Sequence, residues 1–184
     1  MMMNMENDIN SFIDYLMYER RNSKNTYNSY KSDLDDYSLF LKQRRINSFN
    51  NVSKDDITRY LEFLSKEDMK STTIARKLTA IKNFHKYLYS MNLCTNDVSL
   101  TVSRPKLVKK LPNVLTVEEV DKLLNVTLNT PYDYRNKAML EVLYGTGLRI
   151  SELLDLKMFD IDFENCIIRC IGKGSKERIV PIGE

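Results

Sequence analysis

The stretch that decides the fold is YGTGLRISELLDLKMFDIDFENCIIRCIGKGSKERIVPIGE, residues 144–184. A sharp Gly-Thr-Gly turn at residues 145–147 predicts the start of a short helix over residues 148–156, with Arg149 in its first turn. Two predicted strands follow, residues 165–171 and residues 178–182. The segment between them, Gly-Lys-Gly-Ser-Lys, supplies two glycines for a tight turn and two lysines that we expect to be exposed at its tip. The stretch therefore predicts a turn, a helix and a β-hairpin.

Such a unit is suited to bind phosphate. A guanidinium at Arg149, next to a helix N-terminus, can fork onto two phosphate oxygens. On the hairpin tip, Lys173 can reach into a nucleic-acid groove or donate a proton to a leaving oxygen. Two plainer interpretations stay open at this point. Arg149 and Glu152 are three residues apart on a helix and could form a surface ion pair, and Lys173 could be a solvated turn lysine.

The motifs GTGLRISELLDL and IGKGSKERIVPIGE resemble the first half of the catalytic domain of the tyrosine recombinases, the phage integrase family. They are most similar to its Xer branch, and the resemblance runs over essentially the whole chain. It implies that Arg149 grips the scissile phosphate, that Lys173 protonates the leaving 5′-oxygen and that Glu152 supports the site from behind. The implied reaction cleaves and rejoins DNA through a 3′-phosphotyrosyl link, with no cofactor and no metal.

The family also needs a later histidine-x-x-arginine pair and a tyrosine nucleophile, and neither follows the hairpin. We therefore expect a chain truncated after the lysine hairpin that binds DNA without cutting it. The implied partners are double-stranded DNA and further recombinase protomers, four on one DNA. One alternative is a non-catalytic DNA-binding remnant or regulator derived from an integrase. A helical interaction protein unrelated to DNA is the other, and its binding would depend little on salt.

Composition fits a soluble protein, with 42% hydrophobic and 29% charged residues among 184. No apolar run is long enough to span a membrane, and the N-terminus lacks a secretory signal. Three cysteines in an unexported chain predict reduced thiols and a cytoplasmic location. Cys166 and Cys170 are expected to share one face of a strand as packing residues. With a single histidine, His85, a Cys/His zinc site is disfavoured, and His85 is predicted to be packed rather than a base.

Residues 1–100 predict four amphipathic helices. Ser53 and Asp56 predict a capping box, and Ser71 or Thr72 is expected to cap the fourth helix. The predicted apolar stripes are Ile9, Phe12, Ile13 and Leu16; Tyr27, Tyr30, Leu34, Tyr37 and Leu41; Ile57, Tyr60, Leu61 and Leu64; and Ile74, Leu78, Ile81, Phe84 and Leu88. The resemblance identifies this lobe as the core-binding (SAM-like) domain, which binds DNA.

Charge is uneven along the chain. Residues 1–100 hold 15 basic and 13 acidic residues, residues 101–112 hold four basic and none acidic, and residues 113–184 hold 9 and 12. The basic segment predicts a linker that contacts phosphates. Hydroxyls and cations at the starts of the second and fourth helices suit the DNA backbone as well, although they could be plain caps. The predicted DNA-binding residues are Ser23, Lys24, Thr26, Ser71, Thr72, Thr73, Arg76, Lys77, Arg104, Lys106, Lys109, Lys110 and Lys176.

Residues 113–184 predict the first part of a mixed α/β catalytic domain. Thr116 and Glu119 predict a capping box. A helix is expected over residues 133–144, and its AMLEVL run, residues 138–143, is expected to be buried. Together these patterns predict a mainly α-helical protein with a small β-hairpin, in which residues 1–100 form the more stable part.

Overall fold

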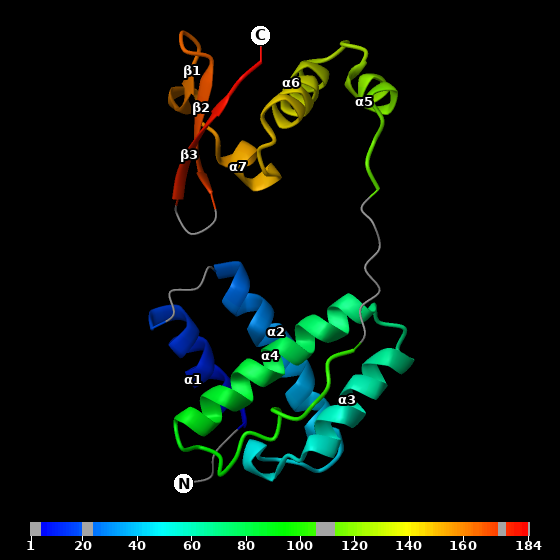
Figure 1. Cartoon of the computed structure of the whole chain (residues 1–184), viewed down its shortest axis with the longest axis vertical. Coiled ribbons are helices and arrows are strands. Elements are labelled where there is room, and N and C mark those ends of the chain that lie inside the picture. The colour runs from blue at the N-terminus through cyan, green and yellow to red at the C-terminus, as the bar shows by residue number, and fades with distance from the viewer. Residues whose placement is uncertain (1–4, 20–23, 106–112, 173–175, 184) are drawn as a thin grey trace. The chain divides into compact units, whose positions relative to one another are not determined.

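The computed structural model describes residues 5–19, 24–105, 113–172 and 176–183, apart from the side chain of Lys176. The chain divides between residues 110 and 111 into two compact units, which we call unit 1 and unit 2 (Figure 1). Each unit is described by itself. Within the described ranges no helix has both the length and the apolar content that a bilayer crossing requires.

Unit 1 is a helical bundle whose predicted stripes converge on one core. Helix α2 packs against α1, α3 and α4, and α4 contacts all three of the others (Figure 1). The helices are α1 (Met5–Tyr18), α2 (Lys24–Gln43), the 3₁₀ helix η1 (Phe49–Asn51), α3 (Lys54–Lys66) and α4 (Ser71–Ser90). Most stripe residues are buried, and Tyr27, Tyr30 and Leu61 pack against the core while partly exposed. The predicted four-helix lobe is confirmed.

Aromatic rings fill the centre of unit 1. The Phe49 ring meets the edge of Phe84 at 4.7 Å between centroids, and Tyr37 stacks near Phe49 at 6.2 Å. His85 is 1% exposed, and its Nε2 lies 3.3 Å from the Tyr37 hydroxyl. Burial lowers the pKa of His85 to about 4, while Asp97 partly opposes this. The prediction of a packed histidine is confirmed.

Of the two helix caps predicted for unit 1, one is present in the structure and the other is not. The Ser53–Asp56 capping box is present at the start of α3. At α4 the N-cap is Lys70 (φ −58°, ψ 136°), which makes no side-chain cap bond, so the prediction that Ser71 or Thr72 caps this helix is wrong. The amides of Thr73 and Ile74 already donate to the Lys70 carbonyl. Ser71 is therefore inside the helix, where the extended cap conformation is not available.

Unit 2 joins three helices to a small antiparallel sheet in the order β1-β2-β3. The two-residue strand β1 pairs with β2 and was not predicted, because two residues show no periodicity. The mainly helical class with a small sheet is confirmed. The elements are α5 (Val117–Leu124), α6 (Pro131–Thr146), α7 (Ile150–Asp155), η2 (Met158–Asp160), β1 (Ile161–Asp162), β2 (Ile167–Gly172) and β3 (Lys176–Pro181).

The two cysteines near β2 do not share a face. Cys170 is buried within the strand, whereas Cys166 is exposed in the preceding turn with φ 52°. The strand begins at Ile167, two residues later than predicted, so strand alternation does not reach Cys166. The expectation that the two cysteines share one strand face as packing residues is therefore wrong for Cys166, whereas Cys170 does pack in the core.

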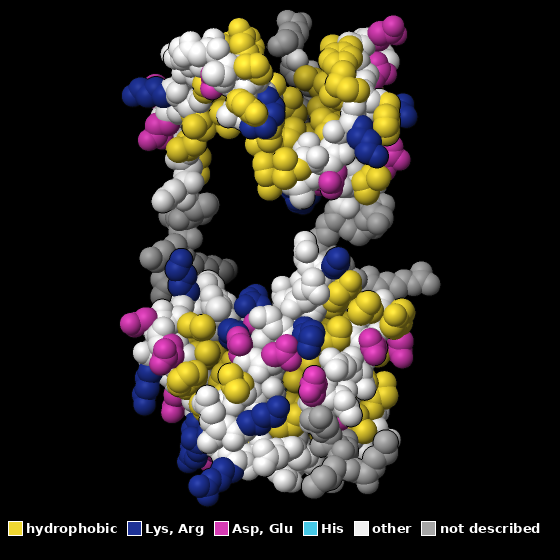
Figure 2. Space-filling model, turned by 180° about the vertical axis from the view of Figure 1, so that it is seen from behind, with side chains coloured by type: hydrophobic (Ala, Val, Ile, Leu, Met, Phe, Trp, Pro, Cys, Tyr) yellow, Lys and Arg dark blue, Asp and Glu magenta, His cyan; other side chains and the backbone are white. Residues whose placement is uncertain are grey.

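Helix α6 is longer than predicted and less buried. It begins at Pro131 behind a Thr130–Asp133 capping box and ends at Thr146, and its C-cap Gly147 has a φ of 62°, the left-handed conformation that favours glycine. No α6 residue is buried, so the prediction for residues 138–143 is wrong. Val142 and Leu143 are half-buried against the small core of Leu148, Ile168 and Cys170. The described neighbours of α6 are chiefly α5 and α7, which cover little of it, and Figure 2 shows hydrophobic side chains gathered on unit 2.

Candidate functional site

Arg149 stands between two helices of unit 2. The left-handed Gly147 ends α6, and the buried Leu148 anchors the turn in the core. Arg149 then serves as the N-cap of α7 with extended backbone (φ −73°, ψ 151°), not as a first-turn residue as predicted. Its side chain is 61% exposed. The turn thus presents a largely solvent-accessible guanidinium on a fixed backbone.

The carboxylate of Glu152 lies behind this guanidinium and is buried. One oxygen, Oε1, accepts from Arg149 Nη1 at 2.8 Å, and the other, Oε2, accepts from the Arg149 amide at 2.8 Å. The backbone bond from Arg149 is the main cause that lowers the pKa of Glu152, and the two nearby guanidiniums act in the same direction. The predicted Arg149–Glu152 pair therefore exists, but one partner is buried. The carboxylate also lies at the N-terminus of α7, where a negative charge is favoured.

Arg178 completes this cluster, and sequence reasoning missed it. Its Nη2 donates to Glu152 Oε2 at 2.6 Å, and its Nε donates to Cys170 Sγ at 3.3 Å. Arg178 is the β3 partner of Cys170, so it lies on the same face of the sheet as the buried Ile168 and Cys170. A charged residue at an inward position of an alternating strand was the available signal.

Two guanidiniums and one carboxylate leave this cluster with one excess positive charge. Glu152 and its bonds hold the cluster together from the inside, while the guanidinium of Arg149 faces solvent. An exposed, oriented guanidinium can bind two oxygens of a phosphate at once. We interpret Arg149, Glu152 and Arg178 as a candidate anion site.

Several predicted site residues lie outside the part of the chain that the structure describes. Lys173, the predicted proton donor, lies outside the described residues, and so does the side chain of Lys176. The predicted DNA-binding residues outside the described ranges are Ser23, Lys106, Lys109 and Lys110.

On unit 1, the first halves of α2 and α4 meet at a shallow hollow of about 280 Å³. Thr26 and Ser29 line it from α2, and Arg76 and Thr79 line it from α4. The structure thus brings together two predicted residues, Thr26 and Arg76, that are far apart in the sequence. Arg76 is about half exposed and forms an ion pair with the buried Asp33 at the edge of the hollow.

Lys77 does not line this hollow. Its side chain is 5% exposed, and its ammonium contacts Asp33 at 3.2 Å and Asp36 at 2.7 Å. The predicted DNA contact is at odds with this position, because the ammonium faces α2 and not solvent. Residue 77 adjoins the buried stripe of α4, being three residues after Ile74 and next to Leu78. Helical spacing could therefore have placed it inside.

The remaining predicted residues of unit 1 lie at helix starts or in the following segment. Lys24 is the first residue of α2, and Ser71 is the first residue of α4. Their side chains are exposed, as are those of Thr72 and Arg104, whereas Thr73 is half-buried.

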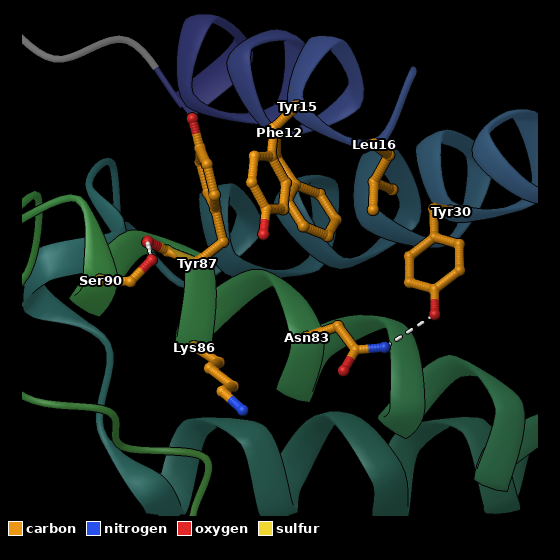
Figure 3. A pocket seen from close by; sticks show the side chains of 8 residues that line it. All are labelled: Phe12, Tyr15, Leu16, Tyr30, Asn83, Lys86, Tyr87 and Ser90. Atoms are coloured by element: carbon orange, nitrogen blue, oxygen red, sulfur yellow. Dashed lines mark hydrogen bonds between the residues drawn. The ribbon is translucent and has the colours of Figure 1, made fainter. Parts of the chain in front are cut away.

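A larger pocket of about 430 Å³ opens between α1, α2 and α4 (Figure 3). Phe12, Tyr15 and Tyr87 form an aromatic wall, with ring centroids 5.0 Å apart for the two tyrosines. Asn83 donates to the Tyr30 hydroxyl at 2.7 Å across the pocket. Because its wall continues into the aromatic core, we interpret this pocket as an opening in the packing and assign it no part in DNA contact. Among the residues that the structure describes, no cluster of three or more His, Cys, Asp or Glu could hold a metal ion.

Comparisons with known proteins agree for both units. A family model described as the phage integrase N-terminal SAM-like domain matches residues 9–92, and one described as the phage integrase family matches residues 113–184. Tyrosine recombinase XerD of Oceanobacillus iheyensis is 41% identical over 181 residues, which are 98% of this chain and 61% of that protein. Tyrosine recombinase XerC of Herpetosiphon aurantiacus is 42% identical over 180 residues, or 97% and 59%. The chain thus spans less than two thirds of the length of these relatives.

Solved structures share the fold. A lambda integrase dimer bound to a COC′ core site matches with a TM-score of 0.78 and 16% identity, over 97% of this chain and 62% of that chain. The Tn1549 transposon integrase in complex with circular intermediate DNA matches with a TM-score of 0.68 and 21% identity, over 99% and 61%. At these identities the likeness concerns the fold alone.

Proposed function

This chain belongs to the phage integrase family of tyrosine recombinases, and from that premise we propose that it acts in site-specific DNA recombination. In this proposal it binds duplex DNA in the cytoplasm, beside further protomers of the same kind. The premise rests on two family matches that together span residues 9–92 and 113–184 and on relatives about 41% identical. Two solved neighbours, the lambda integrase bound to a core site and the Tn1549 transposon integrase in complex with DNA, support the choice of ligand.

One observation carries the proposal: the largely exposed guanidinium of Arg149 is held by the buried carboxylate of Glu152. A guanidinium that is fixed before binding stabilises the negative charge that grows on phosphorus when a nucleophile attacks. We assign this role to Arg149 and the supporting role to Glu152. Lys173 is proposed as the general acid toward the leaving 5′-oxygen. We assign the attacking role in the 3′-phosphotyrosyl reaction to none of the tyrosines in residues 1–184.

On unit 1, the proposed DNA surface is the end of the bundle where α2 and α4 begin. Lys24, Thr26, Ser71, Thr72 and Arg76 offer hydroxyls and cations there, and such groups position a protein on the phosphate backbone. The segment with Arg104 extends the basic charge toward unit 2 along the chain. These contacts would supply most of the affinity and make it sensitive to salt.

A binding experiment tests the proposal on the chain as it stands. Sheared genomic DNA is selected by the 184-residue protein, and affinity for the enriched duplex is measured by fluorescence anisotropy at several salt concentrations. We expect affinity to fall steeply with salt. Arg149→Ala should weaken binding about tenfold and make the salt slope shallower by about 1.

Arg135→Ala is the matched control. It also removes one arginine of unit 2, but this guanidinium is engaged with Asn136 and lies over the Tyr132 ring. We expect it to change binding little. Affinity that is independent of salt, or equal losses in the Arg149 and Arg135 variants, would overturn the proposal.

A further inference from the structure

The carboxylate of Glu152 has three hydrogen-bond donors, and two of them belong to one residue. The amide and the guanidinium of Arg149 both bond to it, but they lie at the same end of α7 as Glu152 itself. These two bonds alone tie the carboxylate to Arg149 and to nothing beyond the helix. The third donor, Arg178, comes from β3, which is 26 residues farther along the chain. It is the donor that can fix the carboxylate relative to the sheet.

Arg178 is itself held in place by the hairpin. Its guanidinium bonds to Cys170 Sγ through Nε and to Glu152 through Nη2, so two different nitrogens of its planar fork are engaged. Cys170 is buried and pairs with Arg178 across the β2–β3 ladder. A planar group bonded at two of its corners has little rotational freedom. The sheet therefore determines where the Nη2 atom lies.

We propose that Arg178 is a positioning residue that sets the guanidinium of Arg149 through the buried carboxylate of Glu152. This inference rests on the proposed function, because Arg178 affects DNA binding in this way only if Arg149 contacts phosphate. The same bond joins α7 to β3 of the β2–β3 hairpin.

Removing Arg178 has a defined structural consequence. Glu152 would keep only its bonds to Arg149, and its carboxylate would be free to rotate, which would loosen its hold on the Arg149 guanidinium. Arg149 would still carry its charge, so general attraction to DNA would persist. What would be lost is the fixed direction of its guanidinium, and a flexible arginine must give up that freedom when it binds.

The first test uses the free chain and needs no DNA. Nitrogen-resolved NMR of arginine side chains measures how fast the Arg149 guanidinium rotates about its Nε–Cζ bond. We expect slow rotation in the wild-type chain and fast rotation in Arg178→Met, which keeps the apolar stem of the side chain. Arg178→Lys can still pair with Glu152 and should restore part of the restraint. Unchanged Arg149 rotation in the methionine variant would overturn the proposal.

The second test is a double-mutant cycle on the DNA affinity of the enriched duplex. Arg178→Met should weaken binding about three- to tenfold, yet it should cost nothing further when Arg149 is already alanine, since coupled residues are not additive. Fully additive losses would mean that Arg178 contacts DNA by itself, and the proposal would fall. Arg169→Ala is the matched control, because Arg169 is exposed on the opposite face of β2. Its loss should add to that of Arg149→Ala.

The two tests separate this proposal from the proposed function. If Arg149→Ala leaves DNA binding unchanged, the proposed function fails, while the NMR measurement still reports whether Arg178 restrains Arg149. If the methionine variant does not fold, the comparison of Arg178→Lys with the wild-type chain carries the same test. A lysine variant with wild-type Arg149 rotation and wild-type DNA affinity would then refute a role for the guanidinium fork.

Discussion

Protonation of His85 should destabilise unit 1 as the pH falls. The imidazole is 1% exposed among the rings of Phe49, Phe84 and Tyr37, so its charged form is excluded from the core. Its pKa falls from 6.5 to about 4 in the folded chain. Between these pH values the unfolded chain binds a proton that the folded chain does not. Stability is therefore fully present above pH 6.5 and is lost as the pH falls toward about 4.

The size of this effect follows from the two pKa values. Each pH step of one costs about 1.4 kcal/mol while only the unfolded state takes up the proton, which amounts to about 3 kcal/mol over the whole window. Such a loss is a large part of the stability of a small domain. Because His85 is the only histidine in the chain, no other imidazole contributes to it.

Urea unfolding followed by circular dichroism at a series of pH values measures the loss. The comparison is with His85→Gln, whose neutral amide can still bond to the Tyr37 hydroxyl. We expect the wild-type chain to lose about 3 kcal/mol more than the variant between about pH 6.5 and about pH 4. Carboxylates titrate in both proteins and cancel in the difference. Identical pH dependence in the two proteins would refute the assignment of a buried, neutral histidine.

Three further predictions concern stability. Asp33→Ala should lower the unfolding free energy of unit 1 by about 2–3 kcal/mol in urea, because it removes one carboxylate from the buried ammonium of Lys77. The control Asp35→Ala breaks only an exposed ion pair on the same helix and should cost less than about 0.5 kcal/mol. Equal costs in the two variants would contradict the buried network. Thr130→Ala should cost about 1 kcal/mol by removing the cap of α6, seen as faster hydrogen exchange in the first turn of that helix; unchanged exchange there would count against the cap. Limited proteolysis should digest residues 113–184 before residues 5–100. The reason is that, among the described residues, the buried hydrophobic core of unit 2 comprises Leu148, Ile168 and Cys170 alone. The reverse order of digestion would show that unit 2 is the more stable unit.

Much of the fold could be predicted because it depends on neighbours in the sequence. The stripes of the four helices in unit 1 follow the 3.6-residue period, and the capping boxes at Ser53 and Thr116 depend on residues three positions apart. The hairpin was visible from its glycine turn, although its strands begin and end a few residues away from the predicted limits. Errors occurred where a boundary mattered, as at Cys166 and at the cap of α4.

In the candidate site, too, contacts between sequence neighbours could be predicted and contacts between distant elements could not. By itself the sequence determined that Arg149 follows a glycine turn and that Glu152 lies within reach, because a spacing of three residues on a helix places side chains together. Only the tertiary structure decided that Glu152 is buried, that Arg178 reaches it from β3, and that Lys77 is held inside unit 1 by two aspartates. Those partners are 26 to 44 residues apart in the chain, and their contacts arise from packing between elements, which no local pattern of residues encodes.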